Sequence, residues 1–452
     1  MTESSAEEKR LYSRVKTNLR VNVADFASGE SINLSEGGLS FGSTETISSP
    51  VISLQICFPD NKFELKTKAK LLWKRNLEKG GSLYGVEFTD LNKVKKAALR
   101  KVLIKIQISG LLNDIKNPEI KKLVSHFFLE DILRYITEII NLTSRLTEKD
   151  QYSLELEKNL DRLNNQILLK GYCLEELLSD KSIMQRVKEN FRHLVGVWVY
   201  KSIIVKRAFE KPRGYPGDYK MLEIVYDNKP ISNNICGIYS DNNFLKSPYA
   251  VAVRIRKDRL REMLLNFINQ TNISKNQILN IACGSCREIR ELLPYLKTKT
   301  IVSFTCLDWD EEALRFSQDK LLRLTPKNVE FNFVKEDVMN IIKNKMSPEL
   351  RNKQNLIYSI GLIDYLPDRI LKKLIQSLFE LLHKGGKLIL THKNRDKTFP
   401  SIPPDWFCDW KFISRNKDEA VKLFYDCGLA DFSLLTESDD FGYIHYFTLI
   451  KK

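Results

Sequence analysis

The stretch Ile278-Leu-Asn-Ile-Ala-Cys-Gly284-Ser-Cys-Arg-Glu288 leads from an apolar segment through a turn into a polar segment. Its apolar part, Gln277–Cys283, has the length of a buried strand. Gly284 stands in the turn, where the lack of a side chain lets the backbone approach a bound molecule closely. A strand that passes through such a turn into a helix predicts an α/β unit with a ligand site at the end of the strand.

The segments that follow repeat the alternation of strand and helix. Further strands are predicted at Ile301–Leu307, Val329–Val334 and Leu356–Ile360, and at Lys387–Thr391 after a Gly385-Gly386 turn. Strands that alternate with helices of this length predict a parallel, doubly wound sheet. We therefore expect a Rossmann-like α/β domain over residues 211–452.

Polar residues end these predicted strands. Asp308 follows the second strand, where a carboxylate can accept hydrogen bonds from ribose hydroxyls, as in dinucleotide-binding folds. Asp337 and Val338 follow the third strand, and Ser359 lies at the end of the fourth. Because the carboxyl ends of parallel strands meet at one edge of a sheet, we expect these residues to share one site.

Taken in order, these features resemble the class I S-adenosylmethionine-dependent methyltransferases. The resemblance implies that the cofactor binds at Ala282, Gly284, Asp308, Asp337, Val338 and Ser359. It also implies that the acidic residue after the third strand contacts the adenine amino group, which disfavours the rival interpretation of a dinucleotide site. Ala282 and Cys286 stand where that family commonly has glycine, so this chain departs from the family pattern at the turn.

A loop rich in glycine and proline lies upstream, Lys211-Pro-Arg-Gly-Tyr-Pro-Gly-Asp-Tyr219, and Ser247-Pro-Tyr-Ala-Val-Ala-Val-Arg254-Ile-Arg256 follows it. The composition of the first segment predicts a rigid, irregular loop. Arg213 is a candidate for binding the carboxylate of the cofactor or of an anionic acceptor. The candidate catalytic residues are Asp218, Tyr219 and Arg256. For each arginine the alternative is a surface salt bridge.

Both segments resemble a bacterial group of methyltransferases associated with the synthesis of 3-hydroxypalmitic acid methyl ester, a cell-density signal. The resemblance covers about residues 185–450 and implies methyl transfer to oxygen on a small or lipid-like acceptor. A carboxylate acceptor is already ionised at neutral pH, so no strong general base is required. The five histidines are accordingly interpreted as structural, although His392 follows the fifth strand and borders the expected pocket.

The eight cysteines are scattered along the chain, which favours free thiols over a disulfide framework. Cys283 and Cys286 form a CxxC pair, but no second pair of ligands lies nearby in the sequence. We therefore expect no metal site, and we interpret both cysteines as lining the turn.

The N-terminal part reads differently. Residues 16–90 show a period of two, as at Ile52, Leu54 and Ile56, and turn signals separate the strands. Several short strands at this spacing predict a small antiparallel barrel, closed by a helix over about residues 91–107.

Two motifs stand on this predicted barrel. Arg10-Leu-Tyr-Ser-Arg14 precedes it, and Asn33-Leu-Ser35-Glu-Gly-Gly38 lies within it. Together they resemble the PilZ domain over residues 8–108. The resemblance implies a cyclic di-GMP site made by Arg10, Arg14, Asn33, Ser35 and Gly38. The chemistry is consistent, since the planar fork of arginine can bind a phosphate or a guanine edge bidentately.

Residues 109–210 have a helical pattern, with Leu156, Leu160, Leu163 and Ile167 on one face of a helix. A helical connector is the simpler interpretation, and a homodimer formed through these helices is the alternative. The sequence thus predicts a multidomain chain of an antiparallel β-barrel, a helical middle region and a C-terminal methyltransferase domain.

Composition narrows the setting of the protein. The N-terminus has no apolar core of a secretory signal, and no segment approaches the roughly 20 apolar residues of a membrane span, so we expect a cytoplasmic protein in bacterial second-messenger signalling. The net charge is +15, but the basic run Lys93–Lys105 is interpreted as a solvated helix face.

Three functions from different classes follow. The leading hypothesis is a small-molecule methyltransferase controlled by cyclic di-GMP. The second is a cyclic di-GMP effector whose methyltransferase domain is a degenerate sensor or scaffold, as Ala282 and Cys286 would suggest. Methylation of nucleic acid is disfavoured, because Ser359-Ile-Gly-Leu stands where adenine-methylating enzymes have a [D/N/S]PP[Y/F/W] string, and Pro403-Pro404 comes after the fifth strand.

Overall fold

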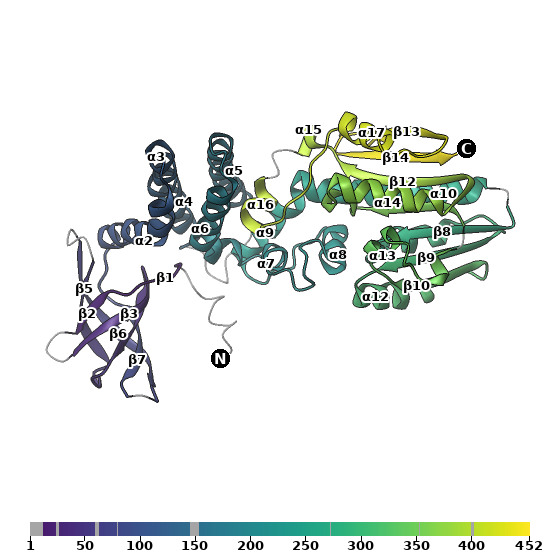
Figure 1. Cartoon of the computed structure of the whole chain (residues 1–452). Coiled ribbons are helices and arrows are strands. Elements are labelled where there is room, and N and C mark those ends of the chain that lie inside the picture. The colour runs from purple at the N-terminus through teal and green to yellow at the C-terminus, as the bar shows by residue number, and fades with distance from the viewer. Residues whose placement is uncertain are drawn as a thin grey trace. The chain divides into compact units, whose positions relative to one another are not determined.

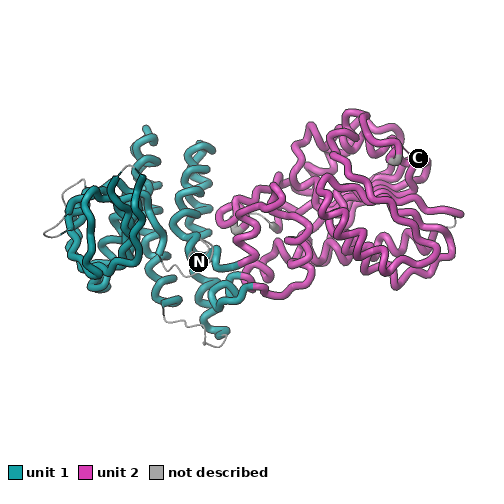
Figure 2. The backbone as a smooth tube through the Cα atoms, turned by 90° about the horizontal axis from the view of Figure 1, so that it is seen from below, with its two compact units in different colours: residues 1–202, 232–240 teal, residues 203–231, 241–452 magenta. Residues whose placement is uncertain are grey.

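A computed structural model describes residues 12–23, 27–58, 63–78, 80–144, 153–271, 273–351, 353–398 and 402–452. Arg10 lies outside these described residues. The chain divides into two compact units, residues 1–202 with 232–240 and residues 203–231 with 241–452 (Figure 2). We call them unit 1 and unit 2. The predicted division into three domains stays a prediction.

Unit 1 begins with an antiparallel barrel (Figure 1). Its strands are β1 (Val15–Lys16), β2 (Arg20–Val23), β3 (Ala27–Ser35), β4 (Gly38–Ser43), β5 (Val51–Cys57), β6 (Glu64–Asn76) and β7 (Ser82–Phe88). The order is β1-β3-β2-β5-β6-β7-β4, and a β3–β4 pairing closes the barrel. The predicted barrel is confirmed.

The side chains of every second strand residue fill the interior of the barrel. Ile52, Leu54 and Ile56 on β5 are buried, and their neighbours point outward. Gly38 lies where β4 meets β7, and a Cβ there would stand 2.0 Å from the carbonyl oxygen of Val86. Only glycine allows this strand pairing, so Gly38 is required by the barrel itself.

The rest of unit 1 is helical. The helices are α2 (Lys93–Asp114), α3 (Pro118–His126), the π-helical η1 (Phe127–Ile132), α4 (Leu133–Thr143), α5 (Leu154–Leu177) and α6 (Lys181–Val199). α2 continues past the predicted end near residue 107, because Ile108 and Leu111 extend its buried face and no proline lies between Lys93 and Pro118. Within the described ranges, no helix has both the length and the apolar character needed to span a membrane.

Unit 2 holds a second sheet (Figure 1). Its strands are β8 (Lys275–Ile281), β9 (Ile301–Asp308), β10 (Val329–Lys335), β11 (Gln354–Ile360), β12 (Leu382–Lys393), β13 (Phe432–Ser438) and β14 (Ile444–Lys451). The order is β10-β9-β8-β11-β12-β14-β13. β8 to β12 run parallel, whereas β13 and β14 are antiparallel. The predicted α/β fold is confirmed.

Helices cover both faces of this sheet. The helical segments are α7 (Ile203–Glu210), α8 (Tyr219–Asp227), α10 (Pro248–Gln270), α11 (Arg287–Leu292), η2 (Leu293–Tyr295), α12 (Glu311–Leu322), α13 (Val338–Ile342), η3 (Pro348–Arg351), η4 (Ile363–Tyr365), α14 (Asp368–Glu380), α15 (Arg395–Thr398), α16 (Ile402–Cys408) and α17 (Lys417–Tyr425). A further helix, α9 (Ile235–Lys246), runs from residues of unit 1 into unit 2. α10, α11 and α12 pack on one face, and α13, α14 and α17 pack on the other.

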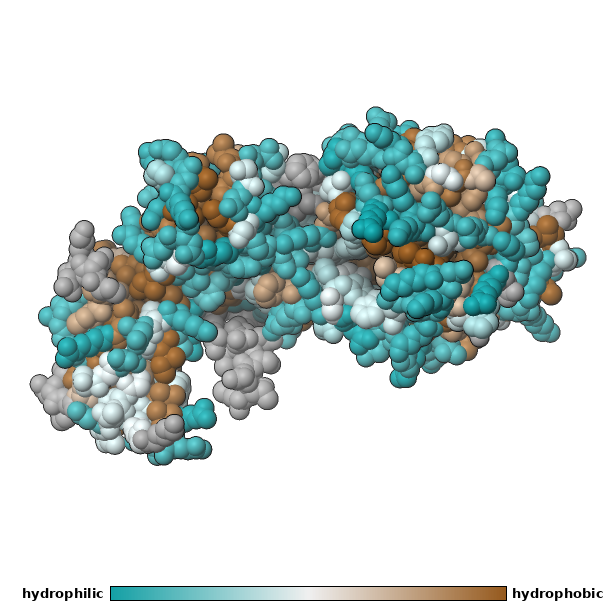
Figure 3. All heavy atoms as spheres, in the orientation of Figure 1, coloured by the Kyte–Doolittle hydropathy of each residue, from teal (hydrophilic) through white to brown (hydrophobic). Residues whose placement is uncertain are grey.

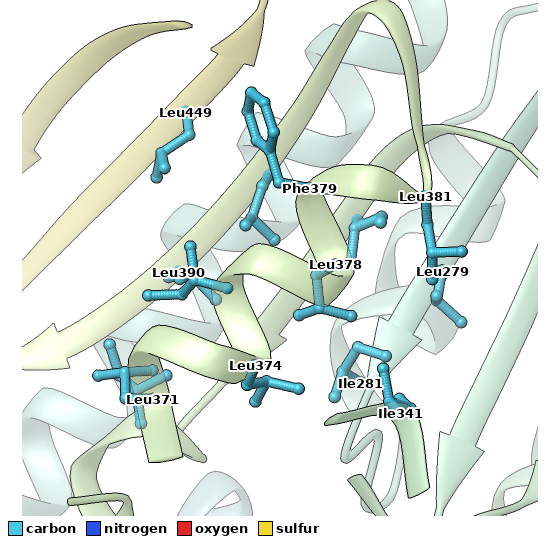
Figure 4. Packing of buried hydrophobic residues seen from close by; sticks show 14 of the residues in the cluster. Leu279, Ile281, Ile341, Leu371, Leu374, Leu378, Phe379, Leu381, Leu390 and Leu449 are labelled. Carbon is cyan, nitrogen blue, oxygen red and sulfur yellow. The ribbon is translucent and has the colours of Figure 1, made fainter. Parts of the chain in front are cut away.

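The second of these cores shows how the sheet is held. Leu371, Leu374 and Leu378 of α14 point at Leu279 and Leu390 of the strands beneath (Figure 4). Their spacings of three and four place them on one face of the helix. Burial of this face fixes α14 over the sheet and leaves the carboxyl ends of the strands for a site.

One predicted turn has a different form. Gly385 and Gly386 lie within β12 instead of preceding it. The register shifts there, because Gln354 pairs with Leu382 while Leu356 pairs with Lys387. β12 has three more residues than β11 between these two pairs, so its chain turns out of the ladder at Gly385, with a φ of 78°, before the regular pairing resumes at Lys387.

Candidate functional site

The turn after β8 has the shape of a cradle. Ala282, Gly284 and Cys286 have φ values of 54°, 53° and 46°, all in the left-handed region. A Cβ placed on Gly284 would meet no heavy atom within 4 Å, so the turn opens onto free space. The non-glycine residues at 282 and 286 thus adopt the left-handed backbone that glycine would accept more easily.

Asp308 holds this turn from the end of β9. Its Oδ2 accepts the Gly284 backbone N–H at 2.8 Å, and its Oδ1 accepts the Asp310 N–H at 2.9 Å. Burial raises the pKa of Asp308, although the backbone donors oppose the shift. Each oxygen keeps a second lone pair, which is what the predicted bond to a ribose hydroxyl would use.

The remaining predicted residues lie at the same edge of the sheet. Asp337 follows β10, is exposed, and caps α13 by accepting the Met339 N–H at 2.8 Å. Val338 begins that helix. Ser359, near the end of β11, donates to the carbonyl oxygen of Ile281 at 2.8 Å and is buried.

The structure therefore brings the predicted cofactor residues on four neighbouring strand ends together. An open cradle at Gly284 and carboxylates at Asp308 and Asp337 fit a molecule that carries a ribose and an adenine. These residues would hold S-adenosylmethionine, which supplies an electrophilic methyl group. The role of each residue stays a prediction.

Sequence reasoning missed a buried polar network beneath the turn. Glu288 on α11 accepts hydrogen bonds from Asn280 Nδ2 at 3.0 Å and from the Tyr358 hydroxyl at 2.8 Å. Burial raises the pKa of Glu288 to about 8, although both hydrogen bonds lower it. Burial therefore favours the protonated form of Glu288, whose hydrogen bonds connect α11 with β8 and β11. An acidic residue at the start of a helix gave no sign of this role.

The charged side chains of the loop over residues 211–219 form ion pairs within the protein. Arg213 pairs with Asp310, with Nε 2.9 Å from Oδ2, and its NH1 lies 2.7 Å from Glu312 Oε1. Asp218 is fully buried, accepts the Met221 N–H at 2.8 Å and so begins α8. In this structure both residues anchor the loop, and Arg213 is not a free cation for a ligand carboxylate.

Tyr219 and Arg256, the other catalytic candidates, are buried. The Tyr219 ring packs on Phe316 with centroids 5.2 Å apart, which makes it a core residue. Arg256 lies against Gly361 at the end of β11, where a Cβ would stand 2.9 Å from its NH2. NH1 of Arg256 lies 3.4 Å from Asp364 Oδ2, and its Nε has no hydrogen-bond partner among the described residues.

In unit 1 the barrel places the described motif residues side by side. Val15 of β1 pairs with Leu34 of β3, so Arg14 lies level with Ser35. The Arg14 side chain is exposed, and Asn33 is half-buried. Ser35 Oγ donates to the Gly38 carbonyl at 3.1 Å and shapes the hairpin. The structure thus brings Arg14, Asn33, Ser35 and Gly38 together, whereas Arg10 lies outside the described residues.

The hairpin also carries a buried charge that the motif did not reveal. Glu36 pairs bidentately with Arg100 of α2, with both N–O distances 2.7 Å. Arg100 belongs to the basic run that we interpreted as solvated, and Lys93, Lys95, Lys101 and Lys105 are indeed exposed. The interpretation was wrong for Arg100, because its side chain is buried against Glu36.

Comparisons with known proteins bear on both units. Residues 8–105 match the family described as "PilZ domain", and residues 213–398 match the family described as "Putative methyltransferase". No match is found among the curated proteins.

Solved structures resemble part of this chain at low identity. One is magnesium protoporphyrin IX methyltransferase from Synechocystis PCC 6803 with bound SAM, which is 14% identical with a TM-score of 0.33. The match covers 45% of this chain and 83% of that protein's chain. The N-methyltransferase NodS from Bradyrhizobium japonicum WM9 is 13% identical with a TM-score of 0.30, covering 43% and 96%. A duf574 family protein from Streptomyces avermitilis is 15% identical with a TM-score of 0.40, covering 51% and 97%.

Proposed function

Since the chain contains a PilZ domain and a domain of a methyltransferase family, we propose that it is a cyclic di-GMP-responsive enzyme that transfers a methyl group from S-adenosylmethionine to a small-molecule acceptor. The observation that carries the proposal is the Asp308 carboxylate, which holds the open Gly284 turn at the edge shared with Asp337.

The proposed acceptor group is an oxygen of a carboxylate on a small or lipid-like molecule. Arg256 and Lys393 both contact the single carboxylate of Asp364, so cations outnumber anions in this buried cluster while Lys393 is protonated, and burial lowers the pKa of Lys393 to about 8. A buried charge is costly without a partner, so an anionic acceptor would complete the cluster. The chain's own task is then to align the acceptor and to exclude water.

We extend the proposal to regulation, because the segment around Arg14 and the β3–β4 hairpin both form hydrogen bonds with helices of unit 1. The Ser13 hydroxyl donates to the Leu194 carbonyl at 2.6 Å, and His193 Nε2 lies 2.8 Å from the Arg14 carbonyl. Arg100 donates to Thr137 on α4 at 2.7 Å. A ligand that orders Arg14 and the hairpin would bias how these helices pack.

Calorimetry with the full chain tests both sites separately. Arg14→Ala should weaken cyclic di-GMP binding by about tenfold or more, the value of one charge-assisted contact, and leave S-adenosylmethionine binding unchanged. Arg20→Ala is the matched control, since Arg20 is an exposed arginine on the same barrel that contacts Asn22. Methyl transfer measured with and without the dinucleotide then tests the coupling, and equal turnover would refute it.

The strained turn favours one second candidate. If the non-glycine residues Ala282 and Cys286 prevent the turn from binding S-adenosylmethionine, the protein is a cyclic di-GMP effector that acts as a scaffold. Binding of cyclic di-GMP without binding of S-adenosylmethionine would select that function.

We also propose that the helices of unit 1 form a homodimer. Leu154, Leu169 and Leu177 of α5 are exposed, with relative accessibilities of 56%, 59% and 63%. Hydrophobic residues reach the surface of the helical region on the face in Figure 3. Light scattering of the wild-type protein and of Leu169→Glu would test this, and a monomeric wild type would refute it.

A further inference from the structure

Asp364, in η4 after β11, receives hydrogen bonds from four donors. Its Oδ1 lies 2.6 Å from His392 Nδ1 and 3.1 Å from the Lys393 backbone nitrogen. Its Oδ2 accepts from Lys393 Nζ at 3.1 Å and from Arg256 NH1. Burial by itself would raise the pKa of Asp364, but Lys393, His392 and Arg256 hold it well below its usual range. Asp364 is therefore an anion at neutral pH.

This anion determines which nitrogen of His392 is basic. An ionised carboxylate only accepts hydrogen bonds, so the nitrogen that faces it, Nδ1, carries a proton. In the neutral imidazole the lone pair then lies on Nε2. Nε2 is buried and has no hydrogen-bond partner among the described residues. Leaving a buried polar atom unsatisfied costs about 1–3 kcal/mol. The Nε2 of His445 is buried without a described partner in the same way, so it is the Asp364 carboxylate at Nδ1 that distinguishes His392.

His392 lies at the edge where the methyl donor is proposed to bind. Ile360 of β11 pairs with Thr391 of β12, so His392 is level with Gly361. Gly361 has a φ of 89° and lies against the guanidinium of Arg256. The imidazole thus stands at the same edge as Ser359 and the turn of β8.

Aromatic side chains surround the same cluster. The Phe412 ring centroid lies 3.6 Å from Lys393 Nζ and 5.9 Å from the ring of Tyr249. Trp410 lies next to Phe412 and donates to the Tyr365 hydroxyl at 2.8 Å. An aromatic acceptor would pack well here, because offset and tilted ring pairs are favourable. Nε2 is buried, so an acceptor can reach it only when neighbouring side chains move.

We infer that the methyltransferase domain also methylates a phenolic hydroxyl, with His392 as the catalytic base. The inference rests on the proposed function. A phenol enters protonated, unlike a carboxylate, and its pKa near 10 lies within reach of an imidazole. As the acceptor oxygen forms its bond to the methyl carbon, the sulfonium–carbon bond breaks and the phenol proton moves to Nε2. The products are an aryl methyl ether, S-adenosylhomocysteine and an imidazolium paired with Asp364.

Matched acceptors separate this role from a structural one. The full chain is assayed with a para-alkylphenol and with the corresponding para-alkylbenzoate, using labelled S-adenosylmethionine. His392→Asn keeps an N–H for Asp364 and removes Nε2. It should lower methylation of the phenol by about 100-fold, the usual contribution of a general base, and spare that of the benzoate.

The control variant is His445→Asn. His445 pairs with His392 across β12 and β14, and its Nδ1 lies 2.8 Å from Ser438 Oγ, not beside a carboxylate. Both acceptors should be methylated as by the wild type. Equal losses with phenol and benzoate in His392→Asn would indicate a structural role and overturn the inference. So would a wild-type protein that binds S-adenosylmethionine but does not methylate the phenol.

Nitrogen NMR of the five histidines gives a readout without turnover. We expect His392 as the Nδ1–H tautomer, with an Nε2 resonance that shifts on addition of the phenol and not of the benzoate. An Nε2–H tautomer, or no response to the phenol, would overturn the inference even if His392→Asn does not fold. Failure of the proposed function is distinct, because it appears as the absence of S-adenosylmethionine binding in calorimetry.

Discussion

Arg100 and Glu36 form a buried, bidentate ion pair between α2 and the β3–β4 hairpin, over a sequence separation of 64 residues. Arg100 also donates to Thr137 of α4, so one guanidinium joins the hairpin of the dinucleotide motif to two helices. The ion pair thus connects the hairpin between Ser35 and Gly38 to the helical part of the same unit.

Removal of one partner of this pair should destabilise unit 1. Arg100→Met leaves the Glu36 carboxylate buried and uncompensated, which typically costs about 3–5 kcal/mol. Denaturant unfolding followed by circular dichroism measures the loss. Glu330→Gln is the control, because its pair with Lys275 is exposed and should contribute about 0–1 kcal/mol. A change for Arg100→Met no larger than that control would contradict the buried role.

Glycine in place of Ala282, a strained position of the β8 turn, should stabilise unit 2. Ala282→Gly relieves a left-handed conformation that costs about 1–2 kcal/mol, partly offset by about 0.4–1 kcal/mol of backbone entropy in the unfolded chain. Cys286→Gly is not used, because it would also remove a fully buried side chain from the core. We expect a small rise in the free energy of unfolding. Asn344→Gly is the comparison, since asparagine tolerates its φ of 53° and should gain less. A loss of stability in Ala282→Gly would show that the turn is not strained at this residue.

Asp308→Asn should weaken binding of S-adenosylmethionine by more than tenfold. An amide has one acceptor atom, so it cannot accept both the Gly284 and the Asp310 backbone N–H groups. The turn would lose its support from β9. Calorimetry measures the affinity, and Asp319→Asn, in an exposed pair on α12, should leave it unchanged. Unchanged affinity in Asp308→Asn would place the cofactor elsewhere.

Glu288 should make stability depend on pH. Burial raises its pKa from 4.5 to about 8, so folding favours the protonated form. The stabilisation is complete below the unfolded pKa of 4.5 and is lost as the pH rises through about 8. In the steepest part, wild-type stability should fall relative to that of Glu288→Gln by about 1.4 kcal/mol per pH unit. Unfolding midpoints of both proteins from acid to mildly alkaline pH test this, and parallel curves would contradict it.

Much of the architecture follows from local patterns. The alternation of buried residues on β5 and the strand–turn–helix at Gly284 were readable because each is set by neighbours in the chain. Strand ends were predicted nearly to the residue, as at Asp308. The predicted end of α2 was wrong, because its buried face continues beyond residue 107. β12 begins before the Gly385-Gly386 turn instead of after it, although its regular pairing with β11 resumes at Lys387 as predicted.

The partners of buried charged groups had no such local signature. Asp364 lies 28 residues before His392, and only the pairing of β11 with β12 brings the two together. Arg213 and Asp218 were recognisable as members of a stiff loop, but their ion pairs depend on Asp310 and Arg207, which packing supplies. The order of strands, turns and helices is therefore written in periodicity and turn residues. The choice of partner for each buried charge is made by packing, because desolvation forces it to find whichever opposite charge the fold places nearby.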